Sequence, residues 1–288
     1  RCRGLLPRGC TILGTSRVQP YQFEDGVARV KESMFRLGLD GFIVIGGNGS
    51  LGAARDLTAD GIPCVGVPKT IDNDVAGTDV TFGFDTAVGV ATDAIDRLHT
   101  TAEAHERVMV VEVMGRDVGH IALHAGLAGG AAMILVPEVP FDIAEVTAVV
   151  ERRRQLGRYA SIIVVAEGAM PIEGTMAMPT YEVDEYGHQR LGGIGVRVAH
   201  ELERRSGVES RTTTLGYVVR GGTPSARDRV LATRFGVAAA NLAAAGQWGS
   251  MVGLSGDVIE AVPLEDVAGR IRGCDLEMYE EVAQVFFS

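Results

Sequence analysis

The residues with the greatest potential for chemistry gather in one short stretch, VPKTIDND, at residues 67–74. It combines a lysine, a threonine hydroxyl and two carboxylates, and it follows the apolar run of residues 62–67, where a buried strand is expected to end. Only two lysines, Lys31 and Lys69, occur in the chain against 25 arginines, so a lysine in this segment calls for an explanation. Ligands of open α/β sheets bind at the carboxyl ends of the strands. We therefore interpret the stretch as a loop that carries phosphoryl-transfer chemistry.

A second candidate loop, GGNGS at residues 46–50, follows an expected strand over residues 42–45. It precedes a helix expected over residues 51–59, with Ser50 placed to cap it. A helix N-terminus leaves backbone N–H groups that can bind an anion, although a tight strand-to-helix turn would explain the glycines equally well. Because parallel strands end at one edge of a sheet, we expect both loops to lie together, and this favours a phosphate cradle.

The two carboxylates of the first loop suit different tasks. Phosphoryl transfer needs positioned phosphates, a divalent cation, an acceptor for the hydroxyl proton and cations for the developing charge. Asp72 and Asp74 alternate in a segment that we expect to be extended, so their side chains would leave opposite faces. One would act as the base, and the other would lie near the metal or support the loop. An Asx-type turn is the alternative interpretation, more so for Asp74 than for Asp72.

Four arginines show a regular spacing around two expected strands. Arg107 and Arg116 flank one strand, Arg211 and Arg220 flank the other, and nine positions separate the members of each pair. At about 3.3 Å per residue, an extended segment would hold each pair roughly 30 Å apart, too far for one small-substrate site. We therefore expect Arg116 and Arg220 to serve the chain's own site. Arg107 and Arg211 would serve a neighbouring subunit, unless they are ordinary surface residues. The spacing thus predicts a homo-oligomer, dimer or tetramer, with shared active sites.

Other metal and redox sites are not indicated. The four cysteines lie far apart and form no C-x-x-C pair, so neither a disulfide framework nor a zinc site is expected. His120 and His124 lie four residues apart on an expected helix, but no third ligand is spaced to join them.

Composition excludes several classes of partner. The formal net charge of −10 argues against general binding of nucleic acids or anionic membranes, which requires a surplus of basic residues. No apolar stretch approaches the roughly 18 residues of a membrane span, and the N-terminus shows no secretory pattern. We expect a cytoplasmic protein.

The elements that must position these residues alternate between strand and helix along the whole chain, which predicts an α/β fold with two doubly wound, mainly parallel lobes. Residues 23–39 show the period of an amphipathic helix. Its expected apolar positions are Val27, Val30, Met34, Phe35 and Leu37.

Five motifs, in order and over nearly the whole chain, resemble the 6-phosphofructokinase family. They are GGNGS (46–50), PKTIDND (68–74), VEVMGR (111–116), VAEG (165–168) and LGYVVRGGTP (215–224). Lipid and NAD kinases share a loop like the first motif, but they would not explain MGR or RGGTP. The resemblance implies phosphoryl transfer to the 1-hydroxyl of fructose 6-phosphate, with Mg²⁺ as cofactor and the active site in the cleft between the two lobes.

The resemblance also implies roles for individual residues. Asp72 matches the general base, flanked by Lys69, Thr70 and Asp74, and Arg116 matches the residue that stabilises the transferring phosphoryl group. The positions matched to the sugar phosphate are Thr70, Asp72, Arg107, Met114, Gly115, Arg116, Glu167, Arg211, Tyr217 and Arg220. The positions matched to the phosphoryl donor are Ser16, Arg17, Gly47, Asn48, Gly49 and Ser50, and Asn48 also matches the magnesium position.

The identity of the donor depends on two residues. Gly49 resembles members that use ATP, whereas members that use pyrophosphate tend to carry aspartate there. Lys69 resembles the pyrophosphate-dependent and mixed branches, because a compact charge suits a compact donor. We favour ATP and keep pyrophosphate as the alternative.

Three departures from the family pattern predict a lower catalytic activity. Asn48 replaces an acidic residue, and Tyr217 replaces a histidine. The family's opening strand and glycine-rich nucleotide loop have no counterpart before Thr11, so we expect an incomplete donor side. A catalytically weak or silent sugar-phosphate-binding subunit is therefore a further alternative.

The division into lobes follows from the same resemblance. We expect a larger, phosphoryl-donor lobe from residues 1–83 and 219–269. A smaller, sugar-phosphate lobe would comprise residues 84–218 and 270–288.

Overall fold

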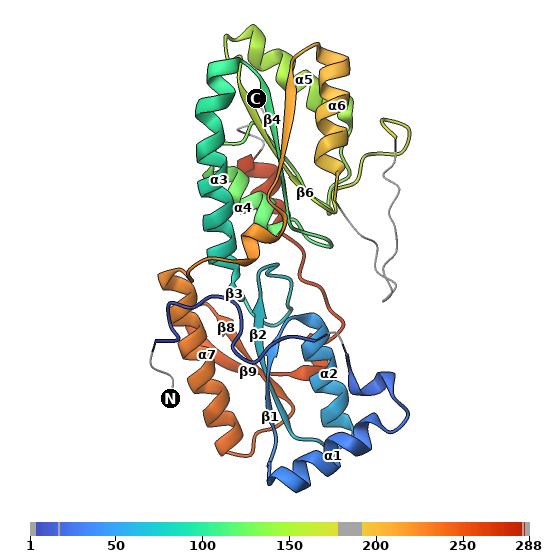
Figure 1. Ribbon diagram of the computed structural model, residues 1–288, viewed down its shortest axis with the longest axis vertical. Coiled ribbons are helices and arrows are strands. Elements are labelled where there is room, and N and C mark those ends of the chain that lie inside the picture. The colour runs from blue at the N-terminus through green and yellow to red at the C-terminus, as the bar shows by residue number, and fades with distance from the viewer. Residues whose placement is uncertain (1–3, 17, 178–191, 284, 286–288) are drawn as a thin grey trace. The chain divides into compact units, whose positions relative to one another are not determined.

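The computed structural model describes residues 4–16, 18–177, 192–283 and 285 (Figure 1). The chain divides into two compact units, and it passes from one to the other after Asp85, Gly222 and Arg272. The prediction placed these switch points after residues 83, 218 and 269. The prediction that the first unit is the larger is wrong, because the second unit contains the longest continuous segment, Thr86–Gly222. This segment includes nearly all of the long helix α3 (Phe84–His105).

The first unit is built on a mainly parallel sheet in the order β1-β2-β8-β9, with β3 beside the end of β2. β1, β2, β3 and β8 run parallel, and β9, a strand that the sequence did not predict, is antiparallel to β8. The strands are β1 (Phe42–Gly46), β2 (Cys64–Thr70), β3 (Phe82–Gly83), β8 (Ser250–Ser255) and β9 (Val258–Pro263).

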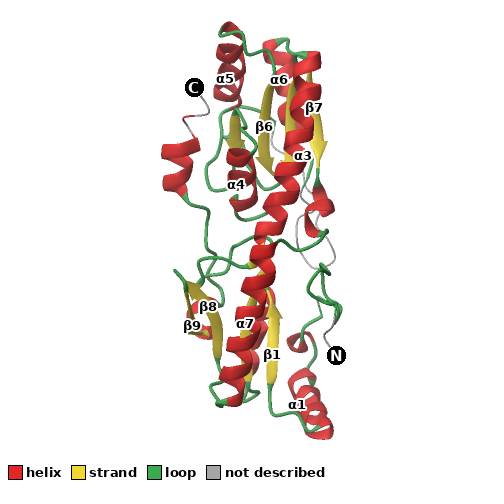
Figure 2. Ribbon diagram, turned by 90° about the vertical axis from the view of Figure 1, so that its left-hand side faces the viewer, coloured by secondary structure: helices red, strands yellow, loops and turns green. Residues whose placement is uncertain are grey.

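Helices cover both faces of this sheet. Figure 1 shows α2 (Asn48–Ala59) on one side of β2 and α7 (Ala226–Ala244) on the other, and Figure 2 shows α7 along the sheet between β8 and β1. The unit also contains the 3₁₀ turn η1 (Pro20–Gln22) and the helices α1 (Gly26–Leu37) and α8 (Leu264–Val267). Leu51 of α2 and Leu264 of α8 are buried against β2, where a Cβ on Gly66 would lie 2.7 Å from the Leu51 side chain. Glycine at this position thus permits close packing of helix on sheet.

Helix α1 is amphipathic as predicted, but its buried face is narrower. Met34 is buried, and Val27 and Val30 pack beside it. Phe35 and Leu37 are 91% and 65% exposed, so the prediction that they face the core is wrong. The helix ends at Leu37, and these two side chains lie beyond the stripe that meets the sheet.

The second unit is built on a fully parallel sheet in the order β5-β6-β4-β7. Its strands are β4 (Val108–Val113), β5 (Met133–Leu135), β6 (Ser161–Ala166) and β7 (Ser210–Thr214). Every residue of β4, β5 and β6 is buried, because helices cover both faces. Sheets buried in this way consist of nearly continuous apolar strands, which is the pattern that the sequence shows.

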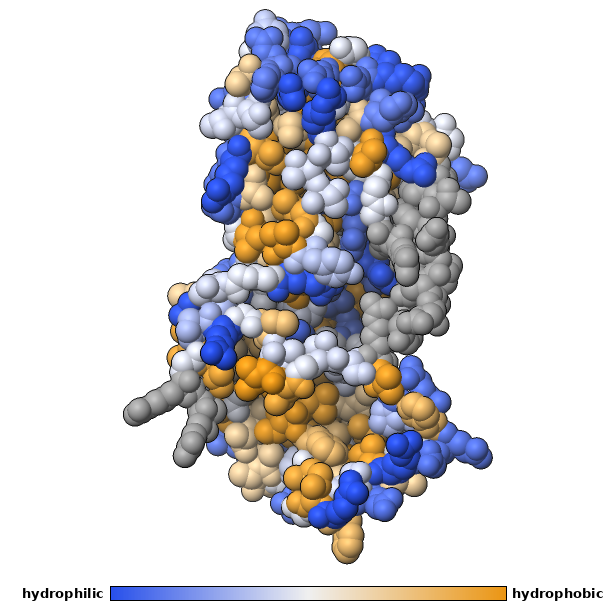
Figure 3. All heavy atoms as spheres, in the orientation of Figure 1, coloured by the Kyte–Doolittle hydropathy of each residue, from blue (hydrophilic) through white to orange (hydrophobic). Residues whose placement is uncertain are grey.

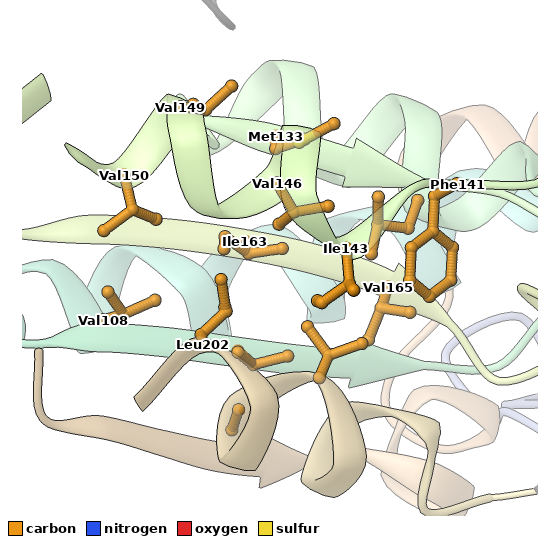
Figure 4. Packing of buried hydrophobic residues seen from close by; sticks show 14 of the residues in the cluster. Val108, Met133, Phe141, Ile143, Val146, Val149, Val150, Ile163, Val165 and Leu202 are labelled. Atoms are coloured by element: carbon orange, nitrogen blue, oxygen red, sulfur yellow. The ribbon is translucent and has the colours of Figure 1, made fainter. Parts of the chain in front are cut away.

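The main core of the second unit lies between its sheet and two helices. In Figure 4, residues of α5 (Ile143–Gln155) and α6 (Ile194–Ser206) pack against alternate residues of β4 and β6, among them Val108 and Ile163. The helix α4 (His120–Ala128) contacts β5 and β6. The remaining elements are the 3₁₀-helix η2 (Gly216–Arg220) and the π-helical turn η3 (Met278–Ala283).

The two sheets with their flanking helices confirm the predicted α/β class. Hydrophilic side chains cover the end of the second unit at which α5 lies, where Glu151 and Arg152 are exposed (Figure 3). Within the described residues, no helix is both long and apolar enough to cross a bilayer.

Candidate active site

The lysine and threonine of the first loop belong to strand β2. Sequence reading ended this strand at Val67, and that boundary is wrong. The short strand β3 extends the pairing, with Lys69 opposite Phe82 and Thr70 opposite Gly83. The hydroxyl of Thr81 also donates a hydrogen bond to the Thr70 carbonyl, at 2.8 Å. Strand pairing therefore holds Lys69 and Thr70, and the loop proper begins after them.

Asn73 determines the shape of the loop. Its φ of 56° lies in the left-handed region, which asparagine tolerates better than most residues. The side chain is buried, and its Oδ1 accepts a hydrogen bond from the Thr81 N–H at 2.9 Å. Arg272 donates from Nη1 to the Asn73 carbonyl at 3.3 Å and from its backbone N–H to the Asp74 carbonyl at 2.9 Å. The prediction of an extended loop is wrong at this residue, and sequence reading missed Arg272.

Asp72 is held by the hydroxyl of Thr70. The Thr70 Oγ1 accepts the Asp72 N–H at 3.1 Å and lies 3.2 Å from Asp72 Oδ2, to which it donates. The Asp72 side chain is half-buried at the end of β2. A carboxylate oriented in this way suits the acceptance of a proton from a substrate hydroxyl.

Asp74 has a different hydrogen-bond partner, so the two carboxylates occupy different surroundings. Asn48 donates from Nδ2 to Asp74 Oδ2 at 2.8 Å and to the Asp74 carbonyl at 3.3 Å. β1 and β2 are parallel neighbours, with Gly46 opposite Pro68. The prediction that the two loops lie together at one sheet edge is thereby confirmed.

The pair of Asn48 and Asp74 fits a magnesium ion. Asn48 Oδ1 is buried and has no hydrogen-bond partner among the described residues. An amide oxygen beside a carboxylate provides two hard ligands, and Mg²⁺ commonly takes its other ligands from water and substrate phosphates. No group of three or more His, Cys, Asp or Glu side chains that could hold a metal occurs in the described chain. Asn48 and Asp74 would thus provide two of the ligands that such an ion needs.

The second loop forms the start of α2. The helix begins at Asn48, with Gly47 as the N-cap and no side-chain cap. Ser50 lies in the first turn, so the prediction that it caps the helix is wrong. Its side chain folds back so closely on Gly46 that a Cβ there would collide with Ser50 Oγ. Because no side chain caps it, the first turn can offer its N–H groups to an anion.

Two positions near this helix start have room for a ligand. Lys69 is half-buried, and its side chain forms no hydrogen bond or ion pair with the residues that the structure describes. The atom nearest to the position that a Cβ on Gly49 would take is Gln19 Nε2, at 4.0 Å. The sequence did not indicate that Gln19 lies beside this helix start. Ser16 is exposed, and its hydroxyl accepts the N–H of the nearby Val18 at 3.0 Å. Arg17 lies outside the described residues.

In the second unit, the ends of β4 and β6 bring Met114, Gly115, Arg116 and Glu167 together. The Glu167 N–H donates to the Val113 carbonyl at 2.9 Å. The Gly168 N–H donates to the Gly115 carbonyl at 3.0 Å, and a Cβ on Gly168 would collide with the Arg116 carbonyl. Met114 is buried, whereas the Arg116 side chain is exposed. The backbone thus fixes the strand ends and leaves the guanidinium accessible.

Tyr217 and Arg220 follow β7 in η2, and both are exposed, Tyr217 by 81%. Arg211 is the second residue of β7, so the segment from Arg211 to Arg220 contains both a strand and a 3₁₀-helix. A 3₁₀-helix rises only about 2.0 Å per residue. The predicted span of roughly 30 Å is therefore too long for this pair.

Arg107 and Arg211 meet at the amino ends of β4 and β7. Arg107 lies just before β4, and Arg211 pairs with Met109 of that strand. Both guanidinium groups form ion pairs with Glu209. The structure thus groups these arginines apart from Arg116 and Arg220, which follow the carboxyl ends of the same strands.

Glu112 is a buried acid that sequence reading missed. Its carboxylate accepts the N–H of Gly193 at 3.0 and 3.2 Å and that of Gly195 at 2.8 Å, at the start of α6. Its carbonyl accepts the Leu215 N–H at 2.9 Å. Glu112 therefore links β4 to α6 and to the segment before η2. The sequence feature that could have indicated its role is a single charged residue inside the otherwise apolar strand VMVVEV.

Replacing Glu112 by alanine is expected to lower the free energy of unfolding by about 2–4 kcal/mol, because it leaves buried N–H groups without an acceptor. Urea unfolding followed by circular dichroism measures this. Glu151→Ala, at an exposed position of α5, is the control and should change little. Equal stability of the two variants would show that Glu112 is not an anchor.

Comparison with known proteins now identifies the family. The Phosphofructokinase family model matches residues 1–243, a span that contains all five motifs. The chain belongs to the phosphofructokinase family. The predicted resemblance is thereby confirmed.

This phosphofructokinase is similar to relatives of two names. It is 55% identical over 286 residues to the pyrophosphate–fructose 6-phosphate 1-phosphotransferase of Streptomyces coelicolor, covering 99% of this chain and 83% of that protein. It is also 55% identical over 282 residues to the ATP-dependent 6-phosphofructokinase of Corynebacterium efficiens, covering 98% and 82%.

Solved structures show the same fold. The Pichia pastoris phosphofructokinase in the T-state superposes with a TM-score of 0.80 at 29% identity, covering 99% of this phosphofructokinase and 30% of that longer chain. The pyrophosphate-dependent phosphofructokinase of Marinobacter aquaeolei gives a TM-score of 0.76 at 26% identity, covering 93% and 68%.

Proposed function

We propose that this phosphofructokinase transfers the γ-phosphoryl group of ATP to the 1-hydroxyl of fructose 6-phosphate, giving fructose 1,6-bisphosphate in cytoplasmic glycolysis. The observation that carries the proposal is the Asp72 carboxylate, held by Thr70 at the end of β2 beside the uncapped start of α2. A base and an anion-binding helix start are two of the parts that phosphoryl transfer needs. A coupled assay of fructose 6-phosphate phosphorylation tests the proposal directly.

In the proposed reaction, the 1-hydroxyl oxygen attacks the γ-phosphorus while Asp72 takes the hydroxyl proton. The bond from this phosphorus to the bridging oxygen breaks, and ADP leaves with the electron pair. The first turn of α2 and Lys69 bind donor phosphates, and Arg116 stabilises the charge on the transferring group. Asn48 and Asp74 would hold Mg²⁺, which supplies further charge neutralisation.

The remaining predicted residues bind the sugar phosphate. In this proposal Met114, Gly115, Glu167, Tyr217 and Arg220 contact the substrate of the same chain. Their grouping at the carboxyl ends of β4, β6 and β7 supports this assignment.

Arg107 and Arg211 would bind the substrate of a neighbouring subunit, so that the enzyme works as a homo-oligomer. Their grouping at the amino ends of β4 and β7, away from the strand ends that carry Arg116 and Arg220, supports this assignment. Two guanidinium groups side by side suit a phosphate.

Pyrophosphate is the second candidate donor. Relatives with both names are 55% identical to the chain, so identity alone does not discriminate. Lys69, whose side chain has no partner among the described residues, would suit pyrophosphate, whereas Gly49 leaves open space that suits the larger nucleotide. We assign ATP because of Gly49.

Replacing Gly49 by aspartate is expected to lower kcat/KM for ATP by about 10- to 100-fold, because a carboxylate at the helix start repels the nucleotide phosphates. Gly49→Ala is the matched control, since it adds a Cβ without charge, and its nearest neighbour, Gln19 Nε2, would lie at 4.0 Å, an ordinary contact distance. Assays with ATP and with pyrophosphate measure the selectivity. Turnover of the unmodified chain with pyrophosphate alone would overturn the assignment.

A further inference from the structure

One carboxylate oxygen joins the two arginines at the amino ends of β4 and β7. Glu209 Oε1 lies 2.6 Å from Arg211 Nη2 and 3.4 Å from Arg107 Nη2. Backbone contacts hold this arrangement, because the Val108 N–H donates to the Glu209 carbonyl at 3.0 Å. Arg211 also donates from Nη1 to the Ser210 carbonyl at 2.9 Å. The carboxylate thus occupies the position that an anion bound by both guanidinium groups would take.

Glu209 is the acid whose carboxylate contacts both guanidinium groups. A second acid, Glu203, reaches Arg211 only at 3.6 Å. Arg107 is the more buried arginine, with 20% of its side chain exposed, and its Nε has no hydrogen-bond partner among the described residues. Among the described residues, Glu209 is the only ion-pair partner of Arg107. An incoming phosphate must therefore displace Glu209 to engage both arginines.

We propose that Glu209 is a built-in competitor that occupies the phosphate-binding arginine pair and lowers its affinity for sugar phosphate. The proposal rests on the role proposed above for Arg107 and Arg211, and it adds a residue that sets the strength of that site. Displacement is feasible because ion pairs of partly exposed groups are weak, whereas a phosphate presents two charges and can bind a guanidinium through two oxygens.

The experiment compares Glu209→Gln with Glu203→Gln in the full chain. Both variants remove one negative charge near Arg211, but only the first frees Arg107 as well. Inorganic phosphate is titrated while the shift in Tm is followed, and fructose 6-phosphate binding is measured by calorimetry. Glu209→Gln is expected to bind both ligands about three- to tenfold more tightly, and Glu203→Gln less than about twofold. Equal or weaker binding by Glu209→Gln overturns the proposal.

A double variant locates the effect. Arg107→Ala combined with Glu209→Gln should lose the gain in phosphate affinity, and a gain that persists overturns the proposal. Glu209→Ala should give the same direction as Glu209→Gln, and higher salt should reduce both gains.

The phosphate titration requires neither turnover nor a neighbouring subunit. If the chain fails to phosphorylate fructose 6-phosphate, the proposed function fails, but the phosphate affinities still decide the role of Glu209.

Discussion

Asp72→Asn is expected to lower kcat for fructose 6-phosphate phosphorylation by about 10²–10⁴-fold, the range by which a positioned general base accelerates a reaction. Asparagine has nearly the same shape, and its Oδ1 can still accept the hydrogen bond from Thr70, so the substitution removes the base and little else. Sugar-phosphate affinity should change by less than about threefold, because uncharged asparagine keeps the contacts of the ground state.

Steady-state assays give kcat, and calorimetry with fructose 6-phosphate gives the affinity. Asp96→Asn, on the exposed side of α3, is the control for the loss of one negative charge. An Asp72→Asn enzyme that keeps more than about a tenth of the original kcat would exclude Asp72 as the base.

Arg116→Ala has the second largest expected effect, a fall in kcat of about 10²–10³-fold, because it removes a cation that stabilises charge in the transition state. Arg107→Ala should act mainly on KM, since its guanidinium would bind a phosphate that does not react. The two variants together test whether active sites are shared.

Chains with Arg116→Ala and chains with Arg107→Ala are refolded together in equal amounts. If each site combines Arg116 of its own chain with Arg107 of a neighbour, about one quarter of the sites in random hybrids carries both arginines. At fructose 6-phosphate concentrations well below the KM of the Arg107→Ala variant, activity should rise accordingly above that of either variant alone. Hybrids without any recovery would show that Arg107 does not reach a neighbour's site.

The sequence predicted the candidate site well where chemistry and local pattern coincide. The two motifs at the ends of β1 and β2 were expected at one sheet edge, and the bond from Asn48 to Asp74 shows that they meet there. The strand predicted between Arg107 and Arg116 is present as β4, because a continuous apolar run between polar residues has few other solutions.

The errors share one cause, which is contact between residues far apart in the chain. The end of β2 was misjudged because β3, a dozen residues later, adds the pairs that include Lys69 and Thr70. Phe35 was placed in the core because periodicity shows that a helix has an apolar face but not how much of that face a neighbour covers. The partners of Glu112 lie some eighty residues further along the chain.

By itself, the sequence determined the α/β class, the family and the residue types available for phosphoryl transfer, because periodicity and motif chemistry are local properties of the chain. Only the tertiary structure decided which side chain orients Asp72, that Asn73 turns the loop through a left-handed conformation, and that Glu209 occupies the arginine pair. These features depend on strand register and on packing between distant segments, and no stretch of sequence specifies them alone.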